Sequence, residues 1–152
     1  MIRIKFKKLA DNAIIPEKKG NLSNILVFRS PADIIVRKKE GEKIPLDLAI
    51  QMETVKGEEI KGGAELQISN PNDELPWGLY GILGTVDVQY RGNIAVMLIN
   101  HLNTDIKIKR GDVVAYGRVN TIPLVDIKTT DTLSETLRGT NGFGHTGVGE
   151  NA

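Results

Sequence analysis

Cysteine is absent from this chain of 152 residues, so disulfide bonds and thiolate metal sites are excluded. The two histidines, His101 and His145, do not have the spacing of a metal site. Gly62-Gly63 is not followed by Gly-Lys-Ser/Thr, so the phosphate-binding loop of nucleotide triphosphatases is missing too. No apolar run approaches the roughly 20 residues of a membrane span, and no signal-peptide core is found. We expect a protein without membrane association that is intracellular, in the cytoplasm or nucleus of a host, or associated with a virion.

A strong excess of one charge is also lacking. The chain has 20 Lys and Arg against 19 Asp and Glu, which gives a formal net charge of +1. Such a balance is not suited to binding polyanions through bulk charge. Near the N-terminus Lys5, Lys7 and Lys8 alternate with Ile4 and Phe6, and this pattern favours a solvated strand face over a nucleic-acid contact.

Short apolar segments, each bounded by Gly, Pro, Asn or Lys-rich turns, dominate the rest of the chain. The predicted strands are 2–6, 25–28, 34–36, 46–52, 64–68, 81–86, 94–100, 105–108, 113–119 and 124–127. Sustained helical periodicity is absent, and the best helical candidate, 130–137, is short and rich in Thr. Many short strands at regular spacing predict one all-β domain, a sandwich or a jelly-roll-like barrel.

The C-terminal segment 138–152 differs from everything before it. It reads RGTNGFGHTGVGENA and has too few aliphatic residues to form a core of its own. One interpretation is a frayed tail. The other is an arm that orders over a ligand, because Phe143 between Gly142 and Gly144 can lie flat on a base while Arg138 and backbone amides meet phosphate oxygens.

A polar segment interrupts the apolar pattern at 84–93, which reads GTVDVQYRGN and predicts a hairpin tip. Asp87 and Tyr90 lie on this tip. Asp87 is a candidate general base if it reaches a water molecule, and Tyr90 can pack on a sugar. The alternative is that the Asp and the Gly only serve the turn.

These segments resemble the motifs of the trimeric dUTPase family. Segment 84–100 resembles the third motif, and 138–147, RGTNGFGHTG, resembles the fifth. KRGDVVAYGRV at 109–119 takes the place of the fourth motif, and IPLDLAI at 44–50 resembles the strand between the first two. The resemblance implies a jelly-roll-like distorted barrel (1–137), a closing arm (138–152), and a homotrimer with exchange of its C-terminal arms. It also implies magnesium-dependent hydrolysis of dUTP to dUMP and pyrophosphate.

The resemblance further implies roles for single residues. Asp87 would orient or deprotonate the attacking water, and Tyr90 would pack on the deoxyribose and disfavour a 2′-hydroxyl. Gly81 and its neighbours would offer backbone groups to uracil. Phe143 would stack on uracil, and Arg138 would meet the γ-phosphate. The remaining substrate-binding candidates are Ser69, Gly142, Gly144, His145 and Thr146.

Several positions depart from the family pattern, and most of them concern the phosphates. Asn24 occupies the position of the first-motif aspartate, so no direct metal ligand is expected and Mg²⁺ would arrive on the substrate phosphates. In the second motif Ser69 is kept, but Ile68 replaces the arginine, the residue suited to bidentate phosphate contacts. In the fourth motif Tyr116 replaces the phosphate-binding glutamine, and Gly117 follows it.

Two alternatives to an active, divergent dUTPase from a virus, phage or mobile element follow from these departures. The first is an inactive scaffold with a structural, regulatory or protein-binding role, for which the loop NDELPW with Trp77 is a candidate surface. The second is a dCTP-deaminating relative, although the acid–base set for that reaction is not found. Arg29, Arg37, Arg91 or Arg118 are candidates for supplying the missing positive charge.

Overall fold

The structure, a computed structural model, describes residues 1–21, 23–71, 73–82, 84–137 and 139–140. All regular secondary structure in this part of the chain is β-strand. The strands are β1 (Ile2–Lys8), β2 (Glu17–Lys18), β3 (Leu26–Arg29), β4 (Ile34–Val36), β5 (Gly41–Pro45), β6 (Leu48–Thr54), β7 (Ala64–Ser69), β8 (Leu79–Gly81), β9 (Gly84–Asp87), β10 (Ala95–Asn100), β11 (Ile106–Ile108) and β12 (Val113–Thr121). The all-β expectation is therefore confirmed.

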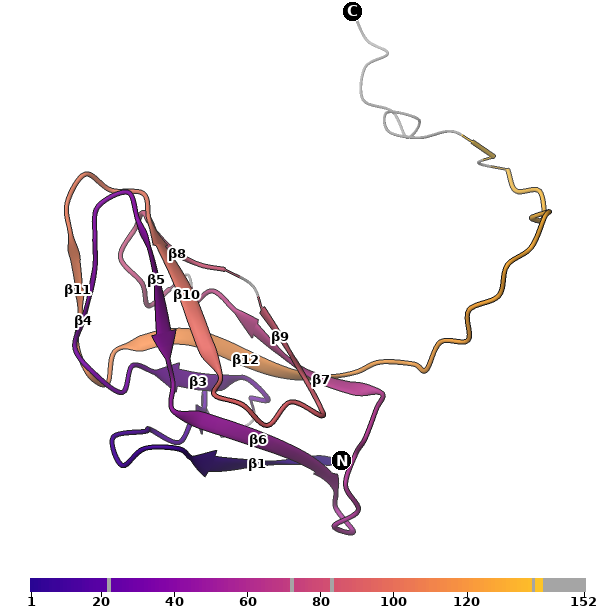
Figure 1. Cartoon of the computed structure of the whole chain (residues 1–152), viewed down its shortest axis with the longest axis horizontal. Helices are drawn as coiled ribbons and strands as arrows, with labels where there is room; N and C mark the ends of the chain where they lie inside the picture. The colour runs from indigo at the N-terminus through magenta and orange to yellow at the C-terminus, as the bar shows by residue number, and fades with distance from the viewer. Residues whose placement is uncertain (22, 72, 83, 138, 141–152) are drawn as a thin grey trace, which may run out of the picture.

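The strands form four small sheets that wrap around one core (Figure 1). The largest has the order β2-β3-β12-β7-β9, and a second has the order β5-β10-β8. Two-stranded sheets β1-β6 and β11-β4 complete the barrel, and every pairing is antiparallel. Neighbours in the sheets are distant in sequence, so the topology brings segments from the whole chain to the edges of the largest sheet.

The alternation of apolar and polar residues determines which face of each strand is buried. In β7, Ala64, Leu66 and Ile68 point into the core, and the residues between them are partly exposed. In β1 the expectation of a solvated basic face is confirmed: Phe6 packs edge-on against Phe28 at 6.1 Å between ring centroids, while the exposed Lys5 pairs with Glu53, whose side chain is only 4% exposed.

Gly117 in β12 has a packing reason. A Cβ atom at this position would lie 2.5 Å from the ring of Phe28 and 3.1 Å from Leu66. Phe28 is fully buried, so its ring packs directly on the backbone of β12. The departure from the family pattern at Gly117 is thus explained by core packing, because any side chain there would push the ring out.

The strand boundaries differ from the sequence predictions in three places. The segment 81–86 is two strands, β8 and β9, which pair with different partners. The segment 124–127 is not a strand, and 130–137 is not a helix. The short strands β2 and β5 were not predicted, because Lys and Glu dominate both segments. Among the described residues no helix is long and apolar enough to cross a membrane.

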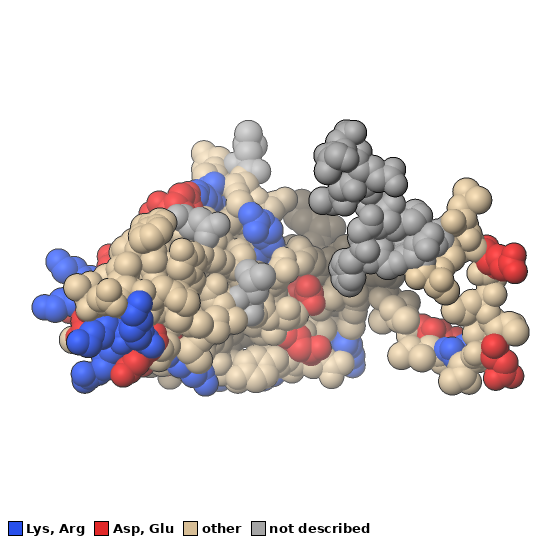
Figure 2. All heavy atoms as spheres, turned by 90° about the horizontal axis from the view of Figure 1, so that it is seen from above, with Lys and Arg blue, Asp and Glu red and all other residues tan. Residues whose placement is uncertain are grey.

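After β12 the chain leaves the barrel as an extended segment, residues 122–137 (Figure 1). Its apolar side chains lie in solvent: Leu124, Val125 and Ile127 are 87%, 77% and 88% exposed. On the face shown in Figure 2, acidic and basic side chains are mixed on the barrel as well as on this segment. An exposed apolar segment of this length is unusual for a protein that acts as a monomer.

Candidate functional site

The polar tip connects two different sheets. β9 pairs with β7 in the largest sheet, whereas β10 pairs with β5 and β8 in another. The expectation of a hairpin formed by these two strands is therefore wrong: the turn 88–93 crosses from one sheet to the next. Val88, which is 2% exposed, anchors this turn in the core.

Asp87 is the last residue of β9 and its side chain is exposed. One carboxylate oxygen, Oδ1, accepts a hydrogen bond from the backbone N–H of Gln89 at 2.6 Å, and the Asp87 carbonyl accepts another from Tyr90 N–H at 3.0 Å. Within the described residues no donor is bonded to Oδ2. Asp87 thus serves the turn through Oδ1, and Oδ2 is available to a water molecule.

The ring of Tyr90 lies directly over the backbone of Gly92. A Cβ atom at Gly92 would be 2.3 Å from the tyrosine oxygen. The Tyr90 hydroxyl donates a hydrogen bond to the carbonyl of Asn93 at 3.1 Å, and the side chain is 46% exposed. The glycine therefore allows the hydroxyl end of the ring to lie against the turn, while the side chain stays half-exposed.

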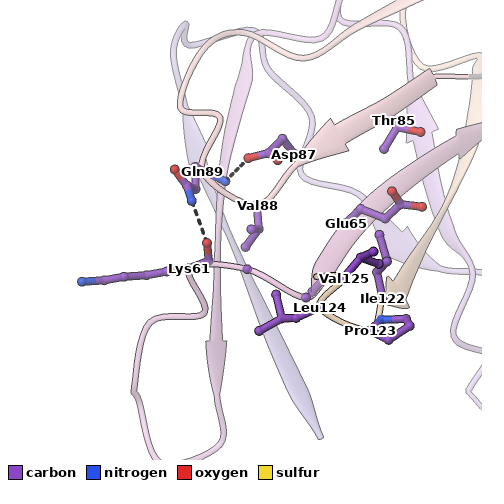
Figure 3. A pocket seen from close by; sticks show the side chains of 13 residues that line it. Lys61, Glu65, Thr85, Asp87, Val88, Gln89, Ile122, Pro123, Leu124 and Val125 are labelled. Atoms are coloured by element: carbon purple, nitrogen blue, oxygen red, sulfur yellow. Dashed lines mark hydrogen bonds between the residues drawn. The ribbon is translucent and has the colours of Figure 1, made fainter. Parts of the chain in front are cut away.

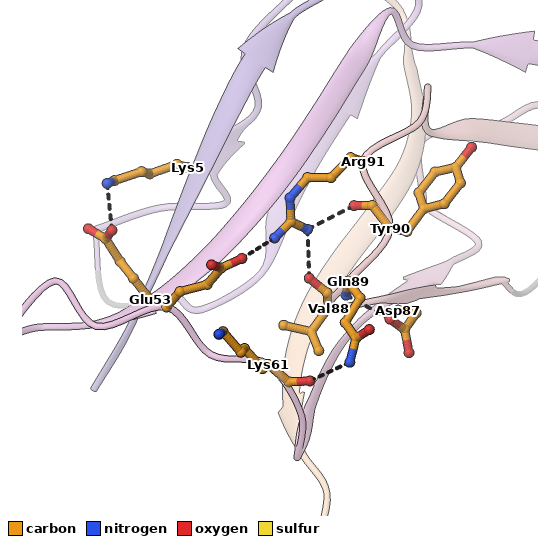
Figure 4. A network of polar contacts seen from close by, with 9 residues as sticks. Lys5, Glu53, Lys61, Asp87, Val88, Gln89, Tyr90 and Arg91 are labelled. Carbon is orange, nitrogen blue, oxygen red and sulfur yellow. Dashed lines mark hydrogen bonds and ion pairs between the residues drawn. The ribbon is translucent and has the colours of Figure 1, made fainter.

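Arg91 holds the turn from the other side (Figure 4). Its guanidinium donates to the carbonyls of Val88 (2.8 Å) and Tyr90 (3.1 Å) and pairs with Glu59 at 2.5 Å. The side-chain amide of Gln89 donates to the carbonyl of Lys61 at 2.7 Å. The segment between β6 and β7 therefore holds the tip at two points.

A cavity of about 320 Å³ opens beside Asp87 (Figure 3). Asp87 and Gln89 form one wall, and the apolar side chains of residues 122–125 form the opposite wall. The lining residues are Lys61, Gly62, Gly63, Ala64, Glu65, Thr85, Asp87, Val88, Gln89, Ile122, Pro123, Leu124 and Val125. A carboxylate above an apolar wall is suited to a ligand with a flat apolar part and a polar edge.

Ser69 and Gly81 lie together, but away from Asp87. Gly81 N–H donates to the side chain of Asn70 at 3.1 Å, and Ser69 Oγ is 3.5 Å from the carbonyl of Tyr116. Along β7, Asp87 faces Glu65, four residues before Ser69. That spacing corresponds to about 13 Å of strand, so within a single chain the two groups of candidates are separated along the largest sheet.

The departures at the phosphate positions have structural counterparts. Ile68 is 3% exposed and its side chain is part of the core, so it contacts no ligand. Tyr116 is buried in β12 opposite Ser69. Asn24 is exposed between β2 and β3.

The remaining candidates, Arg138, Gly142, Phe143, Gly144, His145 and Thr146, lie outside the described residues. His101 is exposed at the end of β10, with its ring 5.4 Å from that of Tyr80. In the described part of the chain, no group of three or more His, Asp or Glu side chains is arranged to hold a metal ion.

Sequence reasoning missed the contacts that fix the tip. Glu59 is 32 residues from Arg91, and Lys61 is 28 residues from Gln89. The register of β7 against β9 brings these residues together, and no local pattern in the sequence signals it. Of the arginines considered as substitutes for the missing charge, Arg29 pairs with Glu17 and Arg91 pairs with Glu59.

The fold and the tip define an all-β protein with a carboxylate and a tyrosine at the junction of two sheets. Known proteins are similar to this chain in sequence and in fold. The family model described as dUTPase matches residues 11–147. The deoxyuridine 5'-triphosphate nucleotidohydrolase of Nautilia profundicola is 34% identical over 151 residues, covering 96% of this chain and 99% of its own. That of Solanum lycopersicum is 33% identical over 145 residues, covering 93% of this chain and 80% of its own.

Solved structures agree in fold. The Staphylococcus bacteriophage 80alpha dUTPase with dUPNHPP has a TM-score of 0.82 and 19% identity, and the match covers 96% of this chain and 99% of the phage protein. At this identity the likeness shows the fold alone. The family match and the two curated relatives carry the assignment: this chain belongs to the dUTPase family.

Proposed function

We propose that this protein is a dUTP diphosphatase, which hydrolyses dUTP to dUMP and pyrophosphate. The observation that carries the proposal is Asp87, which lines a cavity and whose Oδ1 is used by the turn, so that Oδ2 is left for a water molecule. In the reaction Oδ2 orients the attacking water and accepts its proton. The bond between the α- and β-phosphates breaks, and pyrophosphate leaves.

Tyr90 selects the sugar in this proposal. Its ring is held on Gly92 and by the bond to Asn93, so one face remains open to the deoxyribose. A 2′-hydroxyl would collide with that face, which favours deoxyuridine over uridine nucleotides. Phe143 stacks on uracil, and Arg138 meets the γ-phosphate.

The complete site requires more than one copy of the chain. Ser69 and Asp87 are separated along β7, and the apolar side chains of 122–127 are exposed. A homotrimer in which each C-terminal arm crosses to another copy covers these side chains and brings the separated groups to shared interfaces. The driving force is apolar burial: at about 25 cal/mol per Å², a few exposed aliphatic side chains contribute several kcal/mol on association.

Magnesium enters this proposal as part of the substrate. The described residues offer no protein cage for a metal ion, and Mg²⁺ commonly binds through substrate phosphates while keeping several waters. The protein donor set therefore does not fit a resident metal, and no step is assigned to it. A triphosphate with bound Mg²⁺ would carry less negative charge into the site.

Release of pyrophosphate from dUTP with Mg²⁺ tests the proposal, with Asp87→Ala as the comparison. We expect the wild-type chain to turn over dUTP and the variant to lose at least a hundredfold, because a positioned base contributes about 10²–10⁴. Wild-type turnover no higher than that of Asp87→Ala would refute the assignment.

An inactive scaffold that binds another protein is the second candidate. Trp77 favours it, because this side chain is 86% exposed in the loop before β8. Calorimetry with a non-hydrolysable dUTP analogue separates the two candidates: tight Mg²⁺-dependent binding of the analogue supports the enzyme and counts against the scaffold.

A further inference from the structure

Three ionisable side chains meet on the largest sheet, away from the Asp87 cavity, and a fourth, Glu74, lies at their edge with its Oε1 3.4 Å from the Tyr116 hydroxyl. Lys19 comes from the turn after β2, Asp73 from the loop before β8, and Tyr116 from β12. The Lys19 ammonium donates to the Asp73 carboxylate and to the Tyr116 hydroxyl, and it lies 4.2 Å from the centre of the tyrosine ring. The Tyr116 hydroxyl donates to the other Asp73 oxygen at 2.9 Å.

The charges of this Lys19 cluster (Lys19, Asp73 and Tyr116) are well defined. The hydrogen bond to Asp73 raises the pKa of Lys19, and the hydrogen bond from Lys19 lowers the pKa of Asp73. Burial raises the pKa of Tyr116, so its hydroxyl stays protonated. Near neutral pH the cluster therefore contains an ammonium, a carboxylate and a neutral phenol.

The cluster lies on the strand pair that carries Ser69. Tyr116 faces Ser69 in the pairing of β12 with β7, and Ser69 Oγ is 3.5 Å from the Tyr116 carbonyl. Tyr116 itself is buried, whereas the side chains of Lys19 and Asp73 are 37% and 60% exposed. The buried phenol thus fixes the position of a cation at the surface, next to a hydroxyl.

The ion pair in this cluster can open at low cost. An exposed lysine–carboxylate pair typically contributes little net stability because water and salt screen it. A triphosphate carries more negative charge than one carboxylate and can replace Asp73 at the Lys19 ammonium. The ring contact with Tyr116 would persist after this exchange and keep the ammonium oriented.

We propose that Lys19 binds the phosphate groups of the substrate, in place of the arginine that is missing at Ile68, and that Asp73 is the resting counter-ion which the phosphates displace. This inference depends on the proposed function. Ile68 is in the core and offers no charge, while Lys19 brings one to the same strand pair from another element. Because Asp87 of β9 lies opposite Glu65, at the other end of β7 from Ser69, Lys19 acts on the substrate held by the Asp87 of a neighbouring copy.

Calorimetry on the full chain tests this role, with Mg²⁺ and two ligands: a non-hydrolysable imido analogue of dUTP, and dUMP. We expect Lys19→Met to weaken binding of the analogue at least tenfold and to leave dUMP binding within about twofold. Lys19→Arg should keep the analogue within about threefold of wild type. Asp73→Asn should tighten the analogue about two- to fivefold, since the competing carboxylate is gone.

Lys18→Met is the matched control, because Lys18 is the exposed neighbour of Lys19 on β2. It should bind both ligands as the wild type does. Lys19→Met that binds the analogue as tightly as wild type overturns the inference. So does an equal loss of both ligands accompanied by a lower melting temperature, which is the sign of a purely structural contact. If wild-type protein binds neither ligand and releases no pyrophosphate, the proposed function itself fails.

Discussion

Gly92 accommodates the side chain of Tyr90, the residue to which we assign the sugar contact, so Gly92→Ala is a direct test of the tip. A Cβ atom at this position would lie 2.3 Å, 2.5 Å and 2.9 Å from three atoms of the Tyr90 side chain. Ordinary carbon contacts are about 3.5–4.0 Å, so the ring has to move by about 1 Å or more. Because Tyr90 is half-exposed, it can swing into solvent, and the fold should survive the substitution.

The expected cost to stability is small and the cost to selectivity is large. Displacing the ring breaks its hydrogen bond to Asn93, a loss of about 0.5–1.5 kcal/mol. For a domain of this size that corresponds to a fall of about 1–6 °C in melting temperature. Discrimination between dUTP and UTP should fall by about 10- to 200-fold, the range for a single changed contact in a close-fitting pocket.

The assay compares kcat/KM for dUTP and UTP in wild type, Gly92→Ala, Tyr90→Phe and Gly41→Ala. Tyr90→Phe loses only the hydroxyl bond and should keep most of the selectivity. Gly41→Ala is the control for adding a methyl group, since its nearest neighbour atom would be at an ordinary 3.6 Å. A Gly92→Ala protein with wild-type selectivity would refute the role given to the Tyr90 ring.

Three further predictions follow from contacts elsewhere in the molecule. Arg91→Met should lower kcat/KM for dUTP at least tenfold, because the carbonyls of Val88 and Tyr90 lose their donor. Glu59→Gln should have little effect on kcat/KM, because the exposed ion pair between Arg91 and Glu59 contributes about 0–1 kcal/mol to stability. Lys5 and Arg3 on β1 lower the pKa of Glu53. The Glu53 carboxylate therefore stabilises the fold at pH values above its unfolded pKa of about 4.3. This stabilisation is lost as the pH falls through the pKa of Glu53 in the folded protein. Melting curves should therefore show Glu53→Gln less stable than wild type at pH 7, with the difference shrinking below about pH 4; a constant difference would contradict this. Replacing Leu124 and Ile127 together by serine should reduce the oligomer mass in sedimentation experiments, and an unchanged mass would argue against their burial between copies.

Much of the fold was predictable because local patterns determine it. The strand at 34–36 was predicted with its observed limits, and the alternation in β1 and β7 identifies their buried faces. The segment 124–127 has the same apolar composition but no neighbouring strand in the described chain, which is why composition alone gave the wrong answer there. Pairing depends on a partner, and partners distant in sequence leave no local signal.

The candidate site shows the same limit. The motif pattern identified Asp87 and Tyr90, because a carboxylate and an aromatic residue on one polar tip are visible in the sequence. The sequence did not indicate that Lys19 meets Asp73, which lies 54 residues away. That contact requires β2, β3 and β12 to be in register, and the register depends on packing of the whole barrel.

The separation of Asp87, which pairs with Glu65 near the start of β7, from Ser69 at the end of that strand has a genetic consequence. Each polypeptide would contribute the base to one reaction centre and the cation with its serine to another. Two defective alleles, one altered at Asp87 and one at Lys19, would then restore partial turnover when co-expressed, because some mixed assemblies contain a centre built only from intact parts. Neither allele alone, and no mixture of two Asp87 alleles, would do so.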